Sequence, residues 1–126
     1  MFFPGLFAVA VAGSQTFAAL PEPDPDNGAI DLPAGFGATV VADDLGPLRF
    51  LTVRENGDVY VKTRRGGIIG LRDTDGDGRA DEREEFGSGG GTGIAIHDGW
   101  LYHSTNSEVF RYRLDPDQLV PDQLVP

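Results

Sequence analysis

Acidic side chains recur at alternate positions between residues 73 and 84, and their type and spacing suit an oxygen-liganded cation. A twelve-residue calcium loop takes ligands from positions 1, 3, 5, 7, 9 and 12 and turns sharply at a glycine in position 6. Here the ligand positions hold Asp73, Asp75, Asp77, the carbonyl of Arg79, Asp81 (directly or through water) and Glu84. Gly78 occupies the turn. The spacing predicts a calcium site, and a solvated acidic turn is the alternative.

The residues before this loop differ from those of an EF-hand, which places a helix on each side of its loop. Residues 66–71 are rich in glycine and β-branched side chains, a composition typical of a strand. We therefore expect an EF-hand-like calcium loop that connects strands.

Short β-type runs alternate with turn signals from residue 38 onward and predict an all-β fold. The expected strands are 38–42, 50–54, 59–63 and 68–71, followed after the loop by 85–87, 93–96, 100–104 and 109–114. Leu51-Thr52-Val53 matches Ile94-Ala95-Ile96, 43 residues later. A repeat of about 40–45 residues with four strands is typical of a β-propeller blade. The sequence thus predicts about two four-stranded antiparallel blades, and two unrelated hairpins of a sandwich are the alternative.

Composition divides the chain into four parts. Residues 1–19 are apolar and uncharged, and predict a signal peptide or, because large and small side chains alternate, an assembly strand. Residues 20–31 form a tether rich in proline and aspartate, residues 32–116 hold the two blades, and residues 117–126 repeat the pentapeptide DQLVP. The apolar run is too short for a transmembrane span, and a signal peptide predicts a secreted, periplasmic or extracellular location.

The overall charge limits the classes of partner. The 126 residues carry 20 acidic and 10 basic side chains, a formal charge of -10, which argues against nucleic acid. The absence of cysteine excludes disulfides, thiolate metal sites and thiol nucleophiles from this sequence. A hydrophobic content of 40% is enough for one modest core.

Several stretches together carry a family resemblance. They are Leu32-Pro33-Ala34-Gly35-Phe36, the run from Arg72 to Glu82, Gly91-Thr92-Gly93-Ile94-Ala95-Ile96, Leu101-Tyr102, and Phe110-Arg111-Tyr112-Arg113. In combination they resemble the N-terminal part of the glucose/sorbosone dehydrogenase family, over about residues 32–121. The resemblance implies a secreted six-bladed propeller that binds pyrroloquinoline quinone (PQQ) and calcium and oxidises sugars or their aldehydes.

The residues that such an enzyme uses for catalysis are not matched in this sequence. The resemblance places the family's catalytic base and quinone-binding residues in later blades, so no catalytic or cofactor-binding residue is carried over. His97 in a predicted turn and His103 in a predicted strand are better explained as ordinary structural histidines.

The prediction for the chain is therefore a calcium-stabilised, secreted blade module with a structural, self-assembling or binding role. One alternative is the N-terminal fragment of a PQQ-dependent sugar dehydrogenase, in which PQQ binds only as part of a larger propeller. A second is a sugar-binding oligomer that completes a six-bladed ring, because propellers close with about four to eight blades. The expected partners are copies of the chain or the missing blades, with a sugar as a further candidate.

Overall fold

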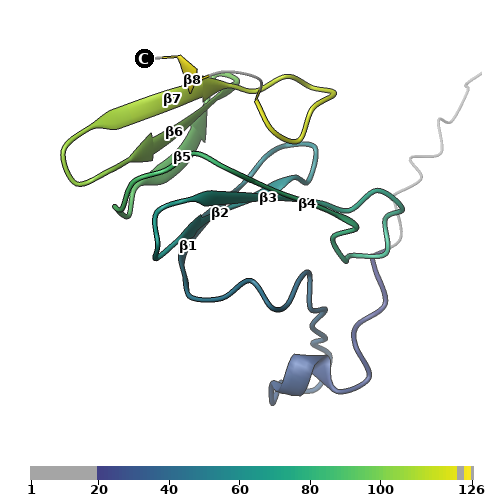
Figure 1. Cartoon of the computed structure of the whole chain (residues 1–126). Helices are drawn as coiled ribbons and strands as arrows, with labels where there is room; N and C mark the ends of the chain where they lie inside the picture. Colours follow the sequence, from purple (N-terminus) through teal and green to yellow (C-terminus); the bar gives the residue numbers. More distant parts are fainter. Residues whose placement is uncertain (1–19, 122–123, 126) are drawn as a thin grey trace, which may run out of the picture.

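The structure is a computed structural model that describes residues 20–121 and the backbone of residues 124–125 (Figure 1). Within these ranges it contains β-strands and one short 3-10 helix, with no α-helix. The elements are η1 (Asn27–Ala29), β1 (Leu48–Val53), β2 (Val59–Thr63), β3 (Ile68–Arg72), β4 (Glu82–Phe86), β5 (Ile94–His97), β6 (Trp100–Ser104), β7 (Val109–Arg113) and β8 (Leu124–Val125). The apolar segment of residues 1–19, predicted to be a signal peptide or an assembly strand, lies outside the described residues.

The strands form two antiparallel sheets in chain order. The first sheet has the order β1-β2-β3-β4 and the second has the order β5-β6-β7-β8, in which β8 is only two residues long. Figure 1 shows the second sheet stacked above the first. The predicted all-β class and its two four-stranded antiparallel sheets are confirmed, and in the described part of the chain neither sheet closes into a barrel.

The sheets repeat one strand pattern, although the first sheet starts later than predicted. β2 and β6 begin 41 residues apart, at 59 and 100, and β3 and β7 do so at 68 and 109. The prediction of a strand at 38–42 is wrong. The first sheet instead takes as its fourth strand β4, which overlaps the strand predicted at 85–87 for the second blade. The β-branched side chains of 38–42 produce a strand signal, but backbone groups in this segment bond to Asp24 and Ala80 instead of to a neighbouring strand.

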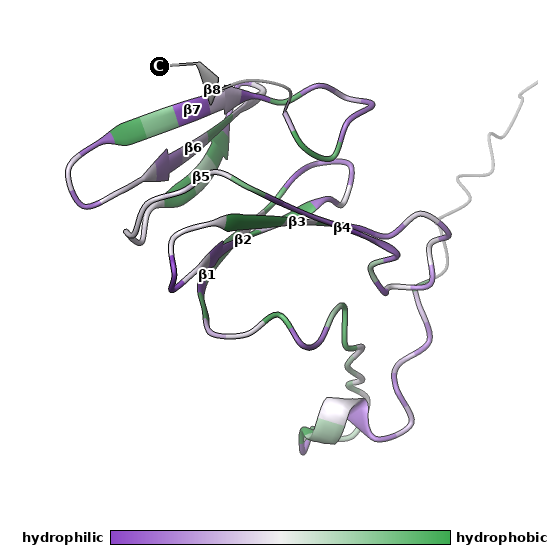
Figure 2. Ribbon diagram, in the orientation of Figure 1, coloured by the Kyte–Doolittle hydropathy of each residue, from purple (hydrophilic) through white to green (hydrophobic). Residues whose placement is uncertain are grey.

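Two hydrophobic clusters lie on opposite faces of the first sheet. Between the sheets, the buried cluster consists of Tyr60, Ile68, Leu101, Tyr112, Leu114 and Leu119. On the other face, Val61, Ile69 and Leu71 pack against Ala42 and Leu45 of the N-terminal segment. β3 is therefore covered on both faces, whereas β4, coloured as hydrophilic in Figure 2, is largely exposed.

The loop that follows β7 joins the two sheets. Its Leu119 is 5% exposed, and the carbonyl of Leu119 accepts a hydrogen bond from the Tyr60 hydroxyl at 2.9 Å. A side chain at Gly70 would begin 3.2 Å from the Leu119 Cγ atom, so glycine allows this close approach. Leu119 and the half-buried Val120 of the first DQLVP pentapeptide thus join the core, whereas its Asp117 and Gln118 are exposed. No helix in the described part of the chain has the length and apolar character needed to cross a bilayer.

Candidate metal centre

The acidic loop leaves the first sheet at the end of β3 and returns as β4. Arg72 and Glu82 lie opposite each other in the β3–β4 ladder, so hydrogen-bonded strands hold both ends of the loop. Between them the chain turns through left-handed glycines, Gly76 at φ 82° and Gly78 at φ 88°. A left-handed conformation costs most side chains about 1–2 kcal/mol, which explains why these positions are glycine.

Asp73 organises the first half of the loop. Its Oδ1 accepts hydrogen bonds from the backbone N–H groups of Asp75 at 3.2 Å and Gly76 at 2.7 Å, and its Oδ2 accepts one from Gly78 at 2.8 Å. The bonds from Gly76 and Gly78 hold the pKa of the Asp73 carboxyl below its usual range. Asp73 is therefore a carboxylate at neutral pH, which is the form that binds a cation.

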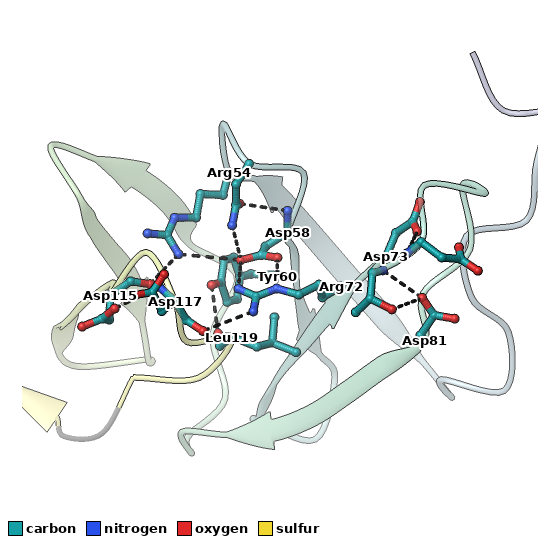
Figure 3. A network of polar contacts seen from close by, with 12 residues as sticks. Arg54, Asp58, Tyr60, Arg72, Asp73, Asp81, Asp115, Asp117 and Leu119 are labelled. Atoms are coloured by element: carbon teal, nitrogen blue, oxygen red, sulfur yellow. Dashed lines mark hydrogen bonds and ion pairs between the residues drawn. The ribbon is translucent and has the colours of Figure 1, made fainter. Parts of the chain in front are cut away.

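Asp81 closes the loop from its other end. Its Oδ2 accepts hydrogen bonds from both the backbone N–H and the hydroxyl of Thr74, each at 2.8 Å (Figure 3). These two bonds lower the pKa of the Asp81 carboxyl. A second carboxylate is thereby fixed beside Asp73 before any ion binds.

Three of the six predicted ligands come together in this loop. One carboxylate oxygen from each of Asp73, Asp75 and Asp81 lies within 4.8 Å of the other two. Three negative charges at this separation repel one another, and a bound cation would remove that repulsion. Carboxylate oxygens are the ligands of hard cations such as calcium, so the donor set fits the predicted ion.

Asp77 and Arg79, which supply two other predicted ligands, also make contacts outside this group, and those of Arg79 involve its side chain and backbone N–H and not the carbonyl predicted as a ligand. The Asp77 Oδ1 accepts a hydrogen bond from the backbone N–H of Arg79 at 2.8 Å. The Arg79 guanidinium forms an ion pair with Asp24 and donates to the carbonyl of Val40 at 3.3 Å. Asp77 and Arg79 therefore shape the second half of the loop and connect it to the N-terminal segment.

Glu84, the predicted ligand at the last loop position, lies in β4. It is opposite Gly70 in the ladder, beside a groove that Arg72, Glu82 and residues 117–120 also line. An extended strand advances about 3.3 Å per residue, so β4 carries Glu84 away from Asp81. In an EF-hand, a helix at this point would turn the side chain back towards the ion.

The N-terminal segment packs against the acidic loop. Asp24 is 9% exposed and its Oδ2 accepts a hydrogen bond from the Val40 N–H at 2.8 Å, while its Oδ1 pairs with Arg79. A side chain at Gly78 would begin 2.8 Å from the Cβ atom of Pro21. The sequence does not identify Asp24 as the ion-pair partner of Arg79, because an aspartate between prolines is typical of a flexible tether and Arg79 lies 55 residues away.

A second polar network lies between the sheets, around Asp58. The side chain of Asp58 is 1% exposed and accepts hydrogen bonds from Arg72 at 2.7 Å and 2.8 Å and from Asn56 at 2.8 Å (Figure 3). Burial raises the pKa of Asp58, but these hydrogen bonds and the charges of Arg72 and Arg54 outweigh it, so that the pKa lies below its usual range. This network holds the two sheets together, and Asp58 is not among the acidic residues that group as possible metal ligands in the described part of the chain.

His103 lies between the sheets and is 2% exposed. Its Nδ1 is 2.9 Å from the Nζ of the fully buried Lys62, which also donates to the carbonyl of Gly89 at 3.1 Å. Burial, followed by the nearby Lys62 charge, lowers the pKa of His103, and burial lowers the pKa of Lys62. The pair is sealed from solvent and suits a structural role.

His97, predicted to lie in a turn, is instead the last residue of β5, where it pairs with Trp100 of β6, and the turn itself is Asp98-Gly99. The His97 Nε2 is 3.2 Å from the Asp98 carboxylate, and the two side chains are 76% and 84% exposed. Water screens a pair this exposed, so the contact provides little fixed orientation for the imidazole.

Comparison of the chain with protein-family models, with curated proteins and with solved structures finds no match. The resemblance to glucose/sorbosone dehydrogenases therefore stays a prediction.

Proposed function

We propose that this chain is a calcium-binding all-β module in which the ion has a structural role. The ion would bind between Asp73, Asp75 and Asp81, with Asp77 and the Arg79 carbonyl as further ligands predicted from the sequence. Glu84, the sixth predicted ligand, lies along β4 and away from this group. The observation that carries this proposal is the convergence of three carboxylate oxygens within 4.8 Å on a loop of calcium-loop spacing.

The surroundings of the loop support a structural role for the ion. The loop is bonded on one side to β3 and β4 and on the other to the N-terminal segment, through Arg79 and through the Ala80 N–H, which donates to the Val41 carbonyl at 2.8 Å. An ion that holds this loop in one conformation would stabilise both attachments. An ion that binds only the folded state raises the free energy of unfolding, by about 2.7 kcal/mol when the ion concentration is a hundred times the Kd.

The test is calcium titration of the full chain by isothermal calorimetry, paired with thermal unfolding in calcium and in chelator. We expect one ion per chain and a lower Tm in chelator. Asp75→Asn keeps an oxygen that can accept the 3.2 Å hydrogen bond from the Asp77 N–H, but it removes one of the three grouped charges.

Asp75→Asn should therefore weaken calcium binding at least tenfold. The matched control is Asp98→Asn, which removes the same charge from a side chain that is 84% exposed and distant from the loop in sequence. No binding heat together with an unchanged Tm in chelator would refute the proposal. Equal calcium affinity of the two variants would show that binding does not involve the grouped carboxylates.

The secreted location, the sugar-dehydrogenase fragment and the sugar-binding ring remain predictions from the sequence. None of them gains support from a specific contact in the described residues.

A further inference from the structure

The contact between the two sheets shows how one repeat of this chain covers the next. Tyr60 and Ile68, on the face of the first sheet that points to the second, are both 0% exposed. They pack in one cluster with Leu101 of the second sheet, and Ile94 and Ile96 lie partly buried against that cluster. Aromatic and aliphatic side chains on facing sheets thus form the interface.

The outer face of the second sheet repeats the first sheet's side of that interface. Thr52 lies opposite Tyr60 in the first sheet, and its counterpart in the repeat, Ala95, lies opposite Tyr102 in the second. Tyr102 therefore occupies the place of Tyr60. By the same register, Val109 corresponds to Ile68, but Val109 is 72% exposed whereas Ile68 is 0% exposed.

Two arginines and a tryptophan complete this outer face, which we call the tail patch (Trp100, Tyr102, Val109, Arg111 and Arg113). Arg111 lies directly opposite Tyr102 and Arg113 opposite Trp100. The guanidinium carbons of Arg111 and Arg113 lie 4.4 Å and 5.3 Å from the centroid of the Trp100 ring. Figure 2 shows the corresponding change along β7, from a hydrophobic start to a hydrophilic section. The tail patch is thus apolar and positively charged in a chain of net charge -10.

The outer face of the first sheet presents the complementary half, which we call the head patch (Leu51 and Val53). These residues match Ile94 and Ile96 in the repeat, but they are 61% and 55% exposed. The N-terminal segment covers the neighbouring β2 and β3 on this face and leaves β1 open.

We propose that copies of this chain associate head to tail, with the tail patch of one copy on the head patch of the next. The arrangement would continue the interface already present between the two sheets. It would cover Leu51, Val53 and Val109, which are exposed in the single chain. Because the two patches differ, the contact is heterologous and can extend beyond two copies. The inference concerns the partner and goes beyond the proposed calcium binding.

The experiment measures the mass of the full chain in calcium buffer by sedimentation velocity over a wide concentration range. The head variant is Leu51→Glu and the tail variant is Val109→Glu, and both change exposed side chains, so circular dichroism should show an unchanged fold. The control is Phe36→Glu, at a side chain that is 72% exposed and outside both patches. Calcium binding is titrated on the same samples, so that failure of the calcium proposal and failure of this inference are read separately.

We expect the wild-type chain and the control to associate as concentration rises, and each patch variant to weaken association at least tenfold, because a carboxylate is costly to bury in an apolar contact. A mixture of the head and tail variants should form two-chain particles and nothing larger, since one intact tail patch meets one intact head patch. A wild-type chain that stays monomeric would overturn the inference. So would variants that associate like the wild type, or a mixture of the two variants that stays monomeric.

Discussion

The buried carboxylate of Asp58 allows a sharp test of what holds the two sheets together. It accepts two hydrogen bonds from Arg72, and Arg72 also donates to the Asp117 carbonyl at 3.4 Å, in the loop that comes from the second sheet. Asp58→Asn keeps the size of the side chain but removes its charge. It also replaces one acceptor oxygen with an amide group that donates towards Arg72.

The expected loss of stability follows from the bonds that this change removes. A hydrogen bond to a charged group contributes about 1.5–3 kcal/mol, and breaking a buried ion pair on one side costs about 3–5 kcal/mol. The Arg72 side chain is 21% exposed, so water screens part of its unpaired charge. We therefore expect the free energy of unfolding to fall by about 3 kcal/mol and the Tm to fall by roughly 10 °C.

Thermal unfolding followed by circular dichroism at pH 7 in calcium buffer measures this change. Asp98→Asn is the control, because it removes the same charge from an exposed turn and should change stability by less than about 0.5 kcal/mol. Since the folded-state pKa of Asp58 is depressed, its contribution is fully present above the unfolded value of about 3.9 and is lost as the pH falls through the folded value. Equal Tm values for the two variants would refute the argument that Asp58 holds the sheets together.

Two further predictions follow from the buried contacts. The pKa of His103 is lowered by burial and by Lys62, so the unfolded chain binds that proton more readily, and stability should fall as the pH drops from about 7 through about 6.5. Urea unfolding across this pH range measures the slope, which His103→Phe should flatten; an equal slope in both proteins would contradict the assignment. Asp24→Asn removes the ion-pair partner of Arg79 and should weaken calcium binding several-fold by calorimetry, whereas Asp31→Asn, an exposed neighbour in sequence, should not.

Much of the fold could be predicted because its signals are local. Alternating apolar residues in 59–63 and 100–104, and the Asn-Gly and Asp-Gly turns that precede them, specify hairpins without reference to the rest of the chain. The segment at 38–42 carries a similar local signal but forms no strand. The first sheet obtains its fourth strand from β4, whose sequence EREEF has little strand character of its own. Its partner β3 determines its conformation.

The candidate site could also be predicted only where its signals are local. The positions of Asp73, Asp75 and Asp81 within the loop follow from spacing and from the glycine turns, and these carboxylates lie together. The twelve-residue pattern assumes a helix after the loop, and that assumption places Glu84 near the ion. Because a strand follows here, the same residue type at the same spacing lies opposite Gly70 instead.

The contact between Asp24 and Arg79 changes how the acidic loop relates to the rest of the molecule. Arg79 and Ala80 attach the loop to the N-terminal segment, and the same segment covers Val61 and Ile69 on the outer face of the first sheet. An ion that favours the folded loop also favours this packing, and the packed segment must favour ion binding by the same free energy. Cation binding at the three grouped aspartates and the cover of the first sheet would therefore be coupled through one loop, although their residues lie far apart in sequence.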